Sequence, residues 1–167
     1  MSVLQNGDTF PDITIDLVGG GRCTLPADLT GSFSVVLFNR GSWCPYCNAQ
    51  LAGFARAHDA LAQAGIRVVA LSVDDEPTAA ALVAKHRLAF PIGYGVDADA
   101  IAAATGAYTN DNPKYLQSTG FILDPPGRVI TAVYSSGAIG RLVADDVVGF
   151  VRYYRSHIAT PAEAGTP

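Results

Sequence analysis

Two short apolar runs, both rich in β-branched residues, predict two buried strands. They cover residues 34–39 and 66–73, and their nearly unbroken apolar character is typical of strands covered on both faces. Between them, apolar residues recur at helical spacings of three, four and seven, at Leu51, Phe54, Ala55 and Ala62. Gly65 stands where a helix of this kind would end. Strand, helix and strand in this order predict a β-α-β unit with parallel strands and a right-handed crossover.

Capping residues predict two further helices, and an apolar stripe predicts a third. Asp75 with Pro77 marks the start of a helix that reaches about residue 87, and Asp97 starts a brief helix that Gly106 ends. A last helix is predicted over residues 143–157, with acidic residues near its start. Its apolar stripe is formed by Val143, Val147, Phe150, Val151 and Tyr154.

The remaining pattern predicts β-structure and one loop. Residues 13–25 read as an N-terminal hairpin around three consecutive glycines, and residues 120–134 as a second hairpin around Pro125, Pro126 and Gly127. A short edge strand is expected within residues 90–95 and a polar loop over 107–113. The alternation predicts an α/β fold, with a central mixed sheet flanked by helices and an N-terminal β-hairpin extension.

Size and charge narrow the class of protein. A chain of 167 residues that is 49% hydrophobic suits one globular domain, which we place at residues 1–158, with 159–167 as a disordered tail. A net charge of −4 disfavours a nucleic-acid partner. No apolar run approaches the roughly 20 residues that span a bilayer, and the opening segment does not resemble a secretory signal. We therefore expect no membrane partner and a cytoplasmic location.

The candidate chemistry lies at Cys44 and Cys47, where the first buried strand meets the helix. Pro45 suits the first helical position, which makes Cys44 the N-cap residue. Backbone N–H groups and the helix dipole both favour a thiolate there, so we expect a lowered pKa and an accessible sulfur for Cys44. Arg40 is expected to add positive charge.

Cys47 lies one turn on, on the same helix face, and we expect it to be less exposed. Cys44 would attack an oxidised substrate and Cys47 would resolve the product as a Cys44–Cys47 disulfide. Two other interpretations remain. The pair could be inert core thiols, or half of a zinc site whose other ligands would come from Cys23 and the three histidines. We expect no metal and no cofactor.

Three stretches carry a family resemblance. "FNRGSWCPYCNAQL", the opening "NGDTFPDITIDLVGGG" and the late "FILDPPGRVITAVY" resemble peroxiredoxin-like members of the alkyl hydroperoxide reductase/thiol-specific antioxidant (AhpC/TSA) family. The resemblance implies a thioredoxin-like fold, a small peroxide or disulfide as substrate, and Cys44 as the attacking thiol. It also implies a thiol reductant such as thioredoxin or glutathione/glutaredoxin, and it makes a homodimer possible.

The chain departs from the family pattern at three positions. Leu37 and Gly41 stand where the family motif has Pro and Thr or Ser, and Ser118 stands where an Arg is usual. Arg40 and Arg141 are the candidates to replace that Arg. The Cys-Pro-Tyr-Cys motif itself resembles glutaredoxin, so the alternative function is a thioredoxin- or glutaredoxin-like disulfide oxidoreductase.

Other residues invite weaker interpretations. Trp43 flanks the nucleophile and could cover the thiol, bind partner peptides or simply pack. His58 falls on the predicted apolar stripe and is expected to be a core or boundary histidine. Cys23 is expected to take no part in the chemistry. Asp74 and Asp75 are expected to belong to a strand end and a helix cap.

Overall fold

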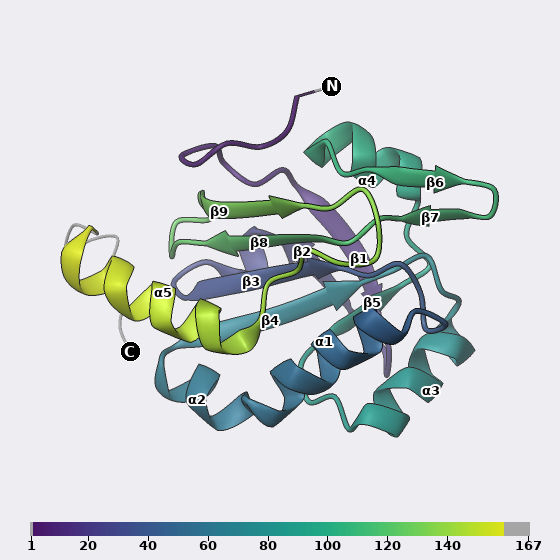
Figure 1. The fold of residues 1–167 in the computed structure, drawn as a ribbon, viewed down its shortest axis with the longest axis horizontal. Helices are drawn as coiled ribbons and strands as arrows, with labels where there is room; N and C mark the ends of the chain where they lie inside the picture. The colour runs from purple at the N-terminus through teal and green to yellow at the C-terminus, as the bar shows by residue number, and fades with distance from the viewer. Residues whose placement is uncertain (1, 159–167) are drawn as a thin grey trace.

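A seven-stranded mixed sheet forms the centre of the molecule, with strand order β2-β1-β5-β4-β3-β8-β9 (Figure 1). The structure is a computed structural model in which residues 2–158 are described; the expected disordered tail, 159–167, lies outside them. The strands of this sheet are β1 (Ile13–Leu17), β2 (Arg22–Leu25), β3 (Phe33–Phe38), β4 (Ile66–Leu71), β5 (Ile92–Tyr94), β8 (Thr119–Leu123) and β9 (Val129–Tyr134). A second sheet pairs β6 (Thr109–Asp111) with β7 (Lys114–Leu116). The helices are η1 (Ala27–Leu29), α1 (Pro45–Arg56), α2 (His58–Gln63), α3 (Glu76–His86), α4 (Ala98–Thr105) and α5 (Ala144–His157).

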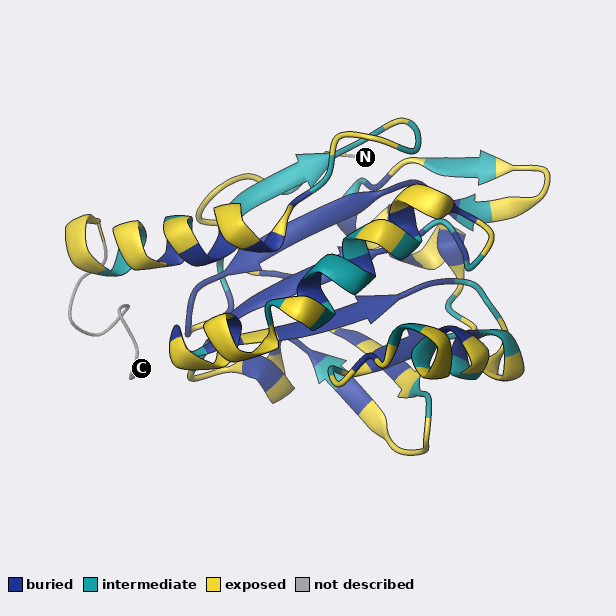
Figure 2. Ribbon diagram, turned by 60° about the horizontal axis from the view of Figure 1, so that its bottom comes forward, coloured by how far each residue is buried: buried dark blue, intermediate teal, exposed yellow. Residues whose placement is uncertain are grey.

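Strand β3 is buried along its whole length because both faces of the sheet are covered (Figure 2). It pairs in parallel with β4 and antiparallel with β8. Val35 and Leu37 face a core shared with α1, α2, α3 and α5, whereas Val36 and Phe38 face a core that includes α4. The predicted β-α-β unit and its parallel pairing are therefore confirmed.

The N-terminal hairpin is confirmed, and its two strands form one end of the main sheet. Gly19, Gly20 and Gly21 all have positive φ, which allows the chain to reverse between β1 and β2. Strand β1 then pairs antiparallel with β5, and β4 pairs with the other side of β5. The prediction that residues 90–95 hold an edge strand is therefore wrong, because β1 occupies that edge.

The helix between β3 and β4 is broken, which the apolar spacing did not predict. Ala57 leaves helical geometry at ψ +10° and separates α1 from α2. The break shifts the buried face, so Leu61 is buried in α2 while Ala62 is exposed. His58 is exposed as well, and the expectation of a core or boundary histidine is wrong.

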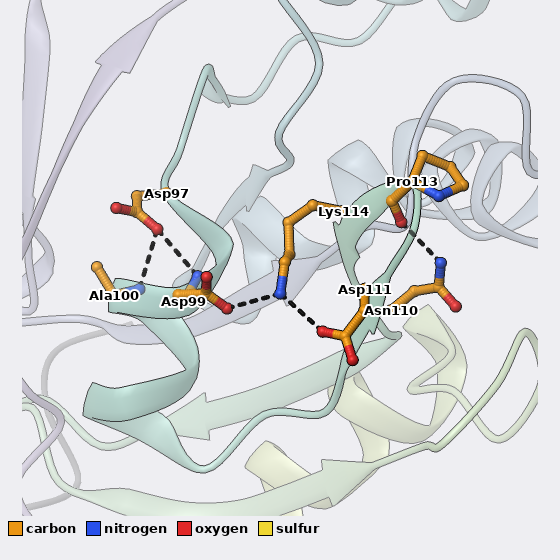
Figure 3. Close-up of polar contacts among 7 residues, drawn as sticks. All are labelled: Asp97, Asp99, Ala100, Asn110, Asp111, Pro113 and Lys114. Atoms are coloured by element: carbon orange, nitrogen blue, oxygen red, sulfur yellow. Dashed lines mark hydrogen bonds and ion pairs between the residues drawn. The ribbon is translucent and has the colours of Figure 1, made fainter.

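Residues 107–113 are not a loop, because they contribute to the β6–β7 hairpin. One ion pair joins this hairpin to α4, with Lys114 Nζ 2.9 Å from Asp99 Oδ1, and a second lies within the hairpin, with Lys114 Nζ 2.8 Å from Asp111 Oδ1 (Figure 3). Asp97 caps α4 by accepting hydrogen bonds from the backbone N–H groups of Asp99 and Ala100. The helix cap predicted at Asp97 is confirmed.

The C-terminal part follows the prediction closely. Strands β8 and β9 form the expected antiparallel hairpin, and α5 buries Val147 and Val151 against the sheet. Val143 is the exception, since it is the N-cap residue of α5 and is 49% exposed. None of the helices within residues 2–158 is both long and apolar enough to span a bilayer.

Candidate thiol site

The junction of β3 and α1 places two sulfurs at the start of a helix. Cys44 is the N-cap residue of α1, with extended backbone angles, and Pro45 occupies the first turn. The backbone N–H of Cys47 donates to Cys44 Sγ at 3.3 Å. This is the local geometry that the sequence predicts, with Cys44 outside the helix and Cys47 inside its first turn.

Both sulfurs are buried, which contradicts the expectation of an accessible Cys44. The side chain of Cys44 is 0% exposed and that of Cys47 is 1% exposed. Two guanidinium groups contact Cys44 Sγ: Arg40 Nη1 lies 3.7 Å away and Arg141 Nη2 lies 3.6 Å away. An N-cap side chain usually meets solvent, but here arginine side chains from two other segments contact it.

Arg40 is held in place by two side chains from the region of β7. Its Nε donates to Gln117 Oε1 at 3.0 Å and its Nη2 donates to the Tyr115 hydroxyl at 3.1 Å. Its backbone N–H donates to Cys47 Sγ at 3.3 Å. The predicted positive charge beside the thiols is confirmed, and the β6–β7 hairpin supplies part of its support.

Trp43 lies at the outer side of the site. Its ring is 5.0 Å from that of Tyr115 in an edge-to-face arrangement, and the Arg40 guanidinium lies 5.0 Å from the Trp43 centroid. Trp43 remains 55% exposed. It therefore packs against the residues that position Arg40 while keeping one side in solvent.

Arg141 lies closer to the inner sulfur than to the outer one. Its Nη2 donates to Cys47 Sγ at 2.8 Å, compared with 3.6 Å to Cys44 Sγ. Its Nη1 donates to Gln50 Oε1 at 2.7 Å, and its Nε donates to the Ala138 carbonyl at 2.6 Å. Arg40 and Arg141 are the two candidates to replace the family's Arg, and both contact the thiols.

The two thiols have opposite pKa shifts. Burial of Cys44 raises its pKa, but hydrogen bonds from the Cys47 thiol, the Cys47 N–H and Arg40, together with the charge of Arg141, outweigh burial and lower it overall. Burial raises the pKa of Cys47, as does its hydrogen bond to Cys44, and the N–H of Arg40 and the charge of Arg141 only partly oppose this. The reduced site thus favours a Cys44 thiolate beside a protonated Cys47.

Within residues 2–158, the other candidate residues make no hydrogen bond to the two sulfurs. Cys23 is buried in β2 and belongs to the core on the opposite face of the sheet from α1. Asp75 caps α3 by accepting from the Thr78 N–H. Asp74 accepts a hydrogen bond from the Ser42 N–H at 2.8 Å, and its burial raises its pKa. Ser118 is buried.

Three contributing residues were missed by the sequence interpretation: Gln50, Tyr115 and Gln117. Gln50 lies on α1 and fixes Arg141, while the other two fix Arg40. Gln50 stands six positions after Cys44 in the sequence, but its partner lies 91 residues away. The spacing along the chain gave no signal for such a pairing.

The charge around the sulfurs disfavours the zinc interpretation. Arg40 and Arg141 present positive charge to Cys44, and Arg141 also contacts Cys47. A zinc ion would have to share this space with two guanidinium groups, which repel a cation. Within residues 2–158, the structure groups no three histidine, cysteine or acidic side chains as a metal site requires.

The fold and the paired sulfurs define a thiol-redox protein of the thioredoxin-like class. Its family follows from a direct match: residues 6–132 fit the model of the AhpC/TSA family, and the chain belongs to that family.

Relatives and solved structures agree with this assignment. A peroxiredoxin of Treponema denticola is 26% identical over 165 residues, covering 94% of this chain and 78% of that protein. A peroxiredoxin of Chlorobaculum tepidum is also 26% identical, covering 94% and 77%. Peroxidoxin BcpB from Mycobacterium tuberculosis has a TM-score of 0.78 at 20% identity, covering 94% of this chain and 99% of that one. Mycobacterium tuberculosis AhpC has the same TM-score and identity, covering 96% and 98%.

These matches confirm the thioredoxin-like peroxiredoxin fold, with its mixed sheet flanked by helices. They also favour a thiol-dependent peroxidase, an oxidoreductase, over the alternative of a thioredoxin- or glutaredoxin-like disulfide oxidoreductase.

Proposed function

We propose that the protein reduces peroxides through Cys44. The Cys44 thiolate attacks one oxygen of the peroxide, the O–O bond breaks, and the leaving oxygen takes a proton to become water or an alcohol. Cys44 is left as a sulfenic acid. The observation that carries this proposal is the position of Cys44 Sγ, which receives the N–H of Cys47 and the guanidinium of Arg40.

Cys47 resolves the sulfenic acid in the second step. Its sulfur attacks Cys44, a Cys44–Cys47 disulfide forms, and the oxygen leaves as water. The position of Cys44 as the N-cap of α1 and of Cys47 in its first turn supports this pairing, because the Cys47 N–H already donates to Cys44 Sγ at 3.3 Å. Arg40 stabilises the thiolate, Trp43 packs against Arg40, and Pro45 starts the helix.

The burial of Cys44 favours a small peroxide over a protein disulfide. Its side chain is 0% exposed, so a sulfur of another folded protein would have to displace neighbouring side chains to reach it. A small peroxide needs a much smaller displacement. This size argument agrees with the peroxiredoxin relatives and supports the same substrate class.

A thiol donor completes the cycle. We propose thioredoxin or glutathione with glutaredoxin in this role, and a cytoplasmic location because such donors maintain reduced thiols there. A homodimer belongs to the same proposal, with β9 at one edge of the sheet as a route for pairing. Residues 1–158 are proposed to form one domain, which limited proteolysis would test.

Stopped-flow kinetics test the peroxidase directly. Reduced protein is mixed with one equivalent of hydrogen peroxide, and peroxide loss is compared with loss in free cysteine at the same concentration. We expect a much faster reaction, abolished in Cys44→Ser and unchanged in Cys23→Ser. Loss no faster than with free cysteine rules out the peroxidase, and turnover of insulin or glutathione disulfide that depends on Cys44 would then support the disulfide oxidoreductase.

A further inference from the structure

Arg141 occupies a fixed position between the two sulfurs. Gln50 Oε1 accepts from its Nη1 and the Ala138 carbonyl accepts from its Nε, so two of its three nitrogens are held by the protein. Gln50 is itself fixed, because its Nε2 donates to the Leu142 carbonyl at 2.9 Å. The remaining nitrogen, Nη2, is directed at the thiols.

The two arginines divide between the two sulfurs. The Arg40 guanidinium contacts Cys44 Sγ at 3.7 Å. Within residues 2–158, the Arg40 side chain makes no hydrogen bond to Cys47. Arg141 Nη2 has its shorter contact, 2.8 Å, with Cys47 Sγ. A charged donor at this distance stabilises the negative form of its acceptor. The sulfur that gains most from Arg141 is therefore the resolving one.

We propose that Arg141 is the catalytic residue of the resolving step, where it holds Cys47 as a thiolate while that sulfur attacks the oxidised Cys44. This inference rests on the proposed function. In the step, Cys47 gives up its proton and its electron pair forms the S–S bond. The S–O bond of the Cys44 sulfenic acid breaks, and the departing hydroxide takes a proton to become water.

The timing of the step follows from the charges around Cys47. In the reduced site, burial and the hydrogen bond that the Cys47 thiol donates to the Cys44 thiolate both raise the pKa of Cys47 and keep its proton in place. Oxidation converts Cys44 to a neutral sulfenic acid and removes that negative charge. Burial still raises the pKa of Cys47, and the Arg40 N–H and the Arg141 guanidinium are the groups that lower it. Arg141 therefore stabilises a Cys47 thiolate from the position it already occupies, 2.8 Å from that sulfur.

A lone-thiol titration tests this role without any peroxide. In Cys23→Ser/Cys44→Ser protein, Cys47 is the only thiol, and a neutral hydroxyl stands where the sulfenic acid would be. Thiolate absorbance near 240 nm is followed against pH. We expect Arg141→Gln to move the midpoint of Cys47 upward by about one pH unit, which is roughly tenfold in thiolate at neutral pH, and Arg141→Lys to move it less.

Rapid-quench mass spectrometry then measures the two chemical steps in Cys23→Ser protein. Arg141→Gln should slow formation of the Cys44–Cys47 disulfide about tenfold near neutral pH and leave more sulfinic acid at Cys44 under excess peroxide. The resolving rate should recover at high pH, where Cys47 ionises unaided. Arg152→Gln, on the exposed face of α5, is the matched control and should change neither step.

Two results would overturn the role of Arg141. One is an unchanged Cys47 midpoint in Arg141→Gln with the lone thiol. The other is a normal resolving rate in Arg141→Gln with only peroxide attack slowed. A parent protein that fails to consume peroxide refutes the proposed function instead, and the lone-thiol titration still decides the role of Arg141.

Discussion

The indole of Trp43 lies directly over the α-carbon of Gly41. A β-carbon at position 41 would stand 2.8 Å from Trp43 Cδ1 and 3.0 Å from Cε2, closer than side chains pack. Gly41 also has a φ of +155°, a conformation that favours glycine. Position 41 is the one where the family motif has Thr or Ser, so its replacement by glycine is coupled to the tryptophan two residues on.

Placing the family's Thr at position 41 should therefore slow the reaction with peroxide. Gly41→Thr is expected to push Trp43 away from Tyr115 and Arg40 and to slow peroxide attack about tenfold, the effect of losing roughly 1.4 kcal/mol of stabilisation. Stopped-flow peroxide loss and Trp43 fluorescence measure the two effects. In a Trp43→Ala background, Gly41→Thr should slow peroxide attack much less, because the indole that a side chain at position 41 would meet is absent. A faster reaction with unchanged fluorescence would contradict this coupling.

The lowered pKa of Cys44 predicts the pH dependence of peroxide attack. The rate should rise with pH and level off below the pH at which an ordinary thiol ionises, since the thiolate is the reacting form. Arg40→Gln removes a charged donor from Cys44 and should shift this inflection to higher pH. Arg22→Gln, whose side chain is 73% exposed, is the control and should leave the profile in place. An unshifted inflection in Arg40→Gln would show that Arg40 does not stabilise the Cys44 thiolate.

Phe121 is expected to be a main determinant of stability. It is fully buried in β8, and its ring contacts those of Phe10, Phe38 and Tyr134 at centroid distances of 5.1, 5.5 and 5.6 Å. Phe121→Ala should lower the free energy of unfolding by about 3–5 kcal/mol, through lost burial and the cavity left behind. Urea denaturation measures this. Ile139→Ala, at a side chain 66% exposed, should change it by less than about 0.5 kcal/mol.

The free energy of unfolding should fall at acid pH, in part because of Asp75. Hydrogen bonds from the side chain and the backbone N–H of Thr78 lower the pKa of Asp75 in the folded state below the unfolded value. The stabilisation is therefore complete above the unfolded pKa and is lost as pH falls through the folded one. Thermal unfolding across acid pH measures it. Asp75→Asn keeps a capping side chain but cannot titrate, so its stability should depend less on pH than that of the parent.

Local signals explain what could be predicted from the sequence. The cap at Cys44 depends on the strand before it and on Pro45 after it, and the cap at Asp97 depends on its own helix. Each of these is decided within a few residues. The same holds for the glycine turn between β1 and β2.

Long-range contacts explain which features could not be predicted from the sequence. Arg141 meets Cys44 across 97 positions and Gln117 meets Arg40 across 77, so no spacing pattern marks either pair. The burial of Cys44 was missed because it depends on these contacts. The β6–β7 hairpin was missed because its strands are only three residues long and lack a clear alternation of apolar and polar residues.

The placement of both sulfurs on one turn of α1 means that oxidation changes the charge of the protein more than its shape. A disulfide between the N-cap residue and the first turn closes a loop of only four residues, so it requires little change in the sheet and the other helices. It removes the thiolate that both Arg40 and Arg141 contact and leaves two guanidinium groups at the same sulfur. Reduction restores that anion, so the reduced form is stabilised and the disulfide should be a comparatively strong oxidant.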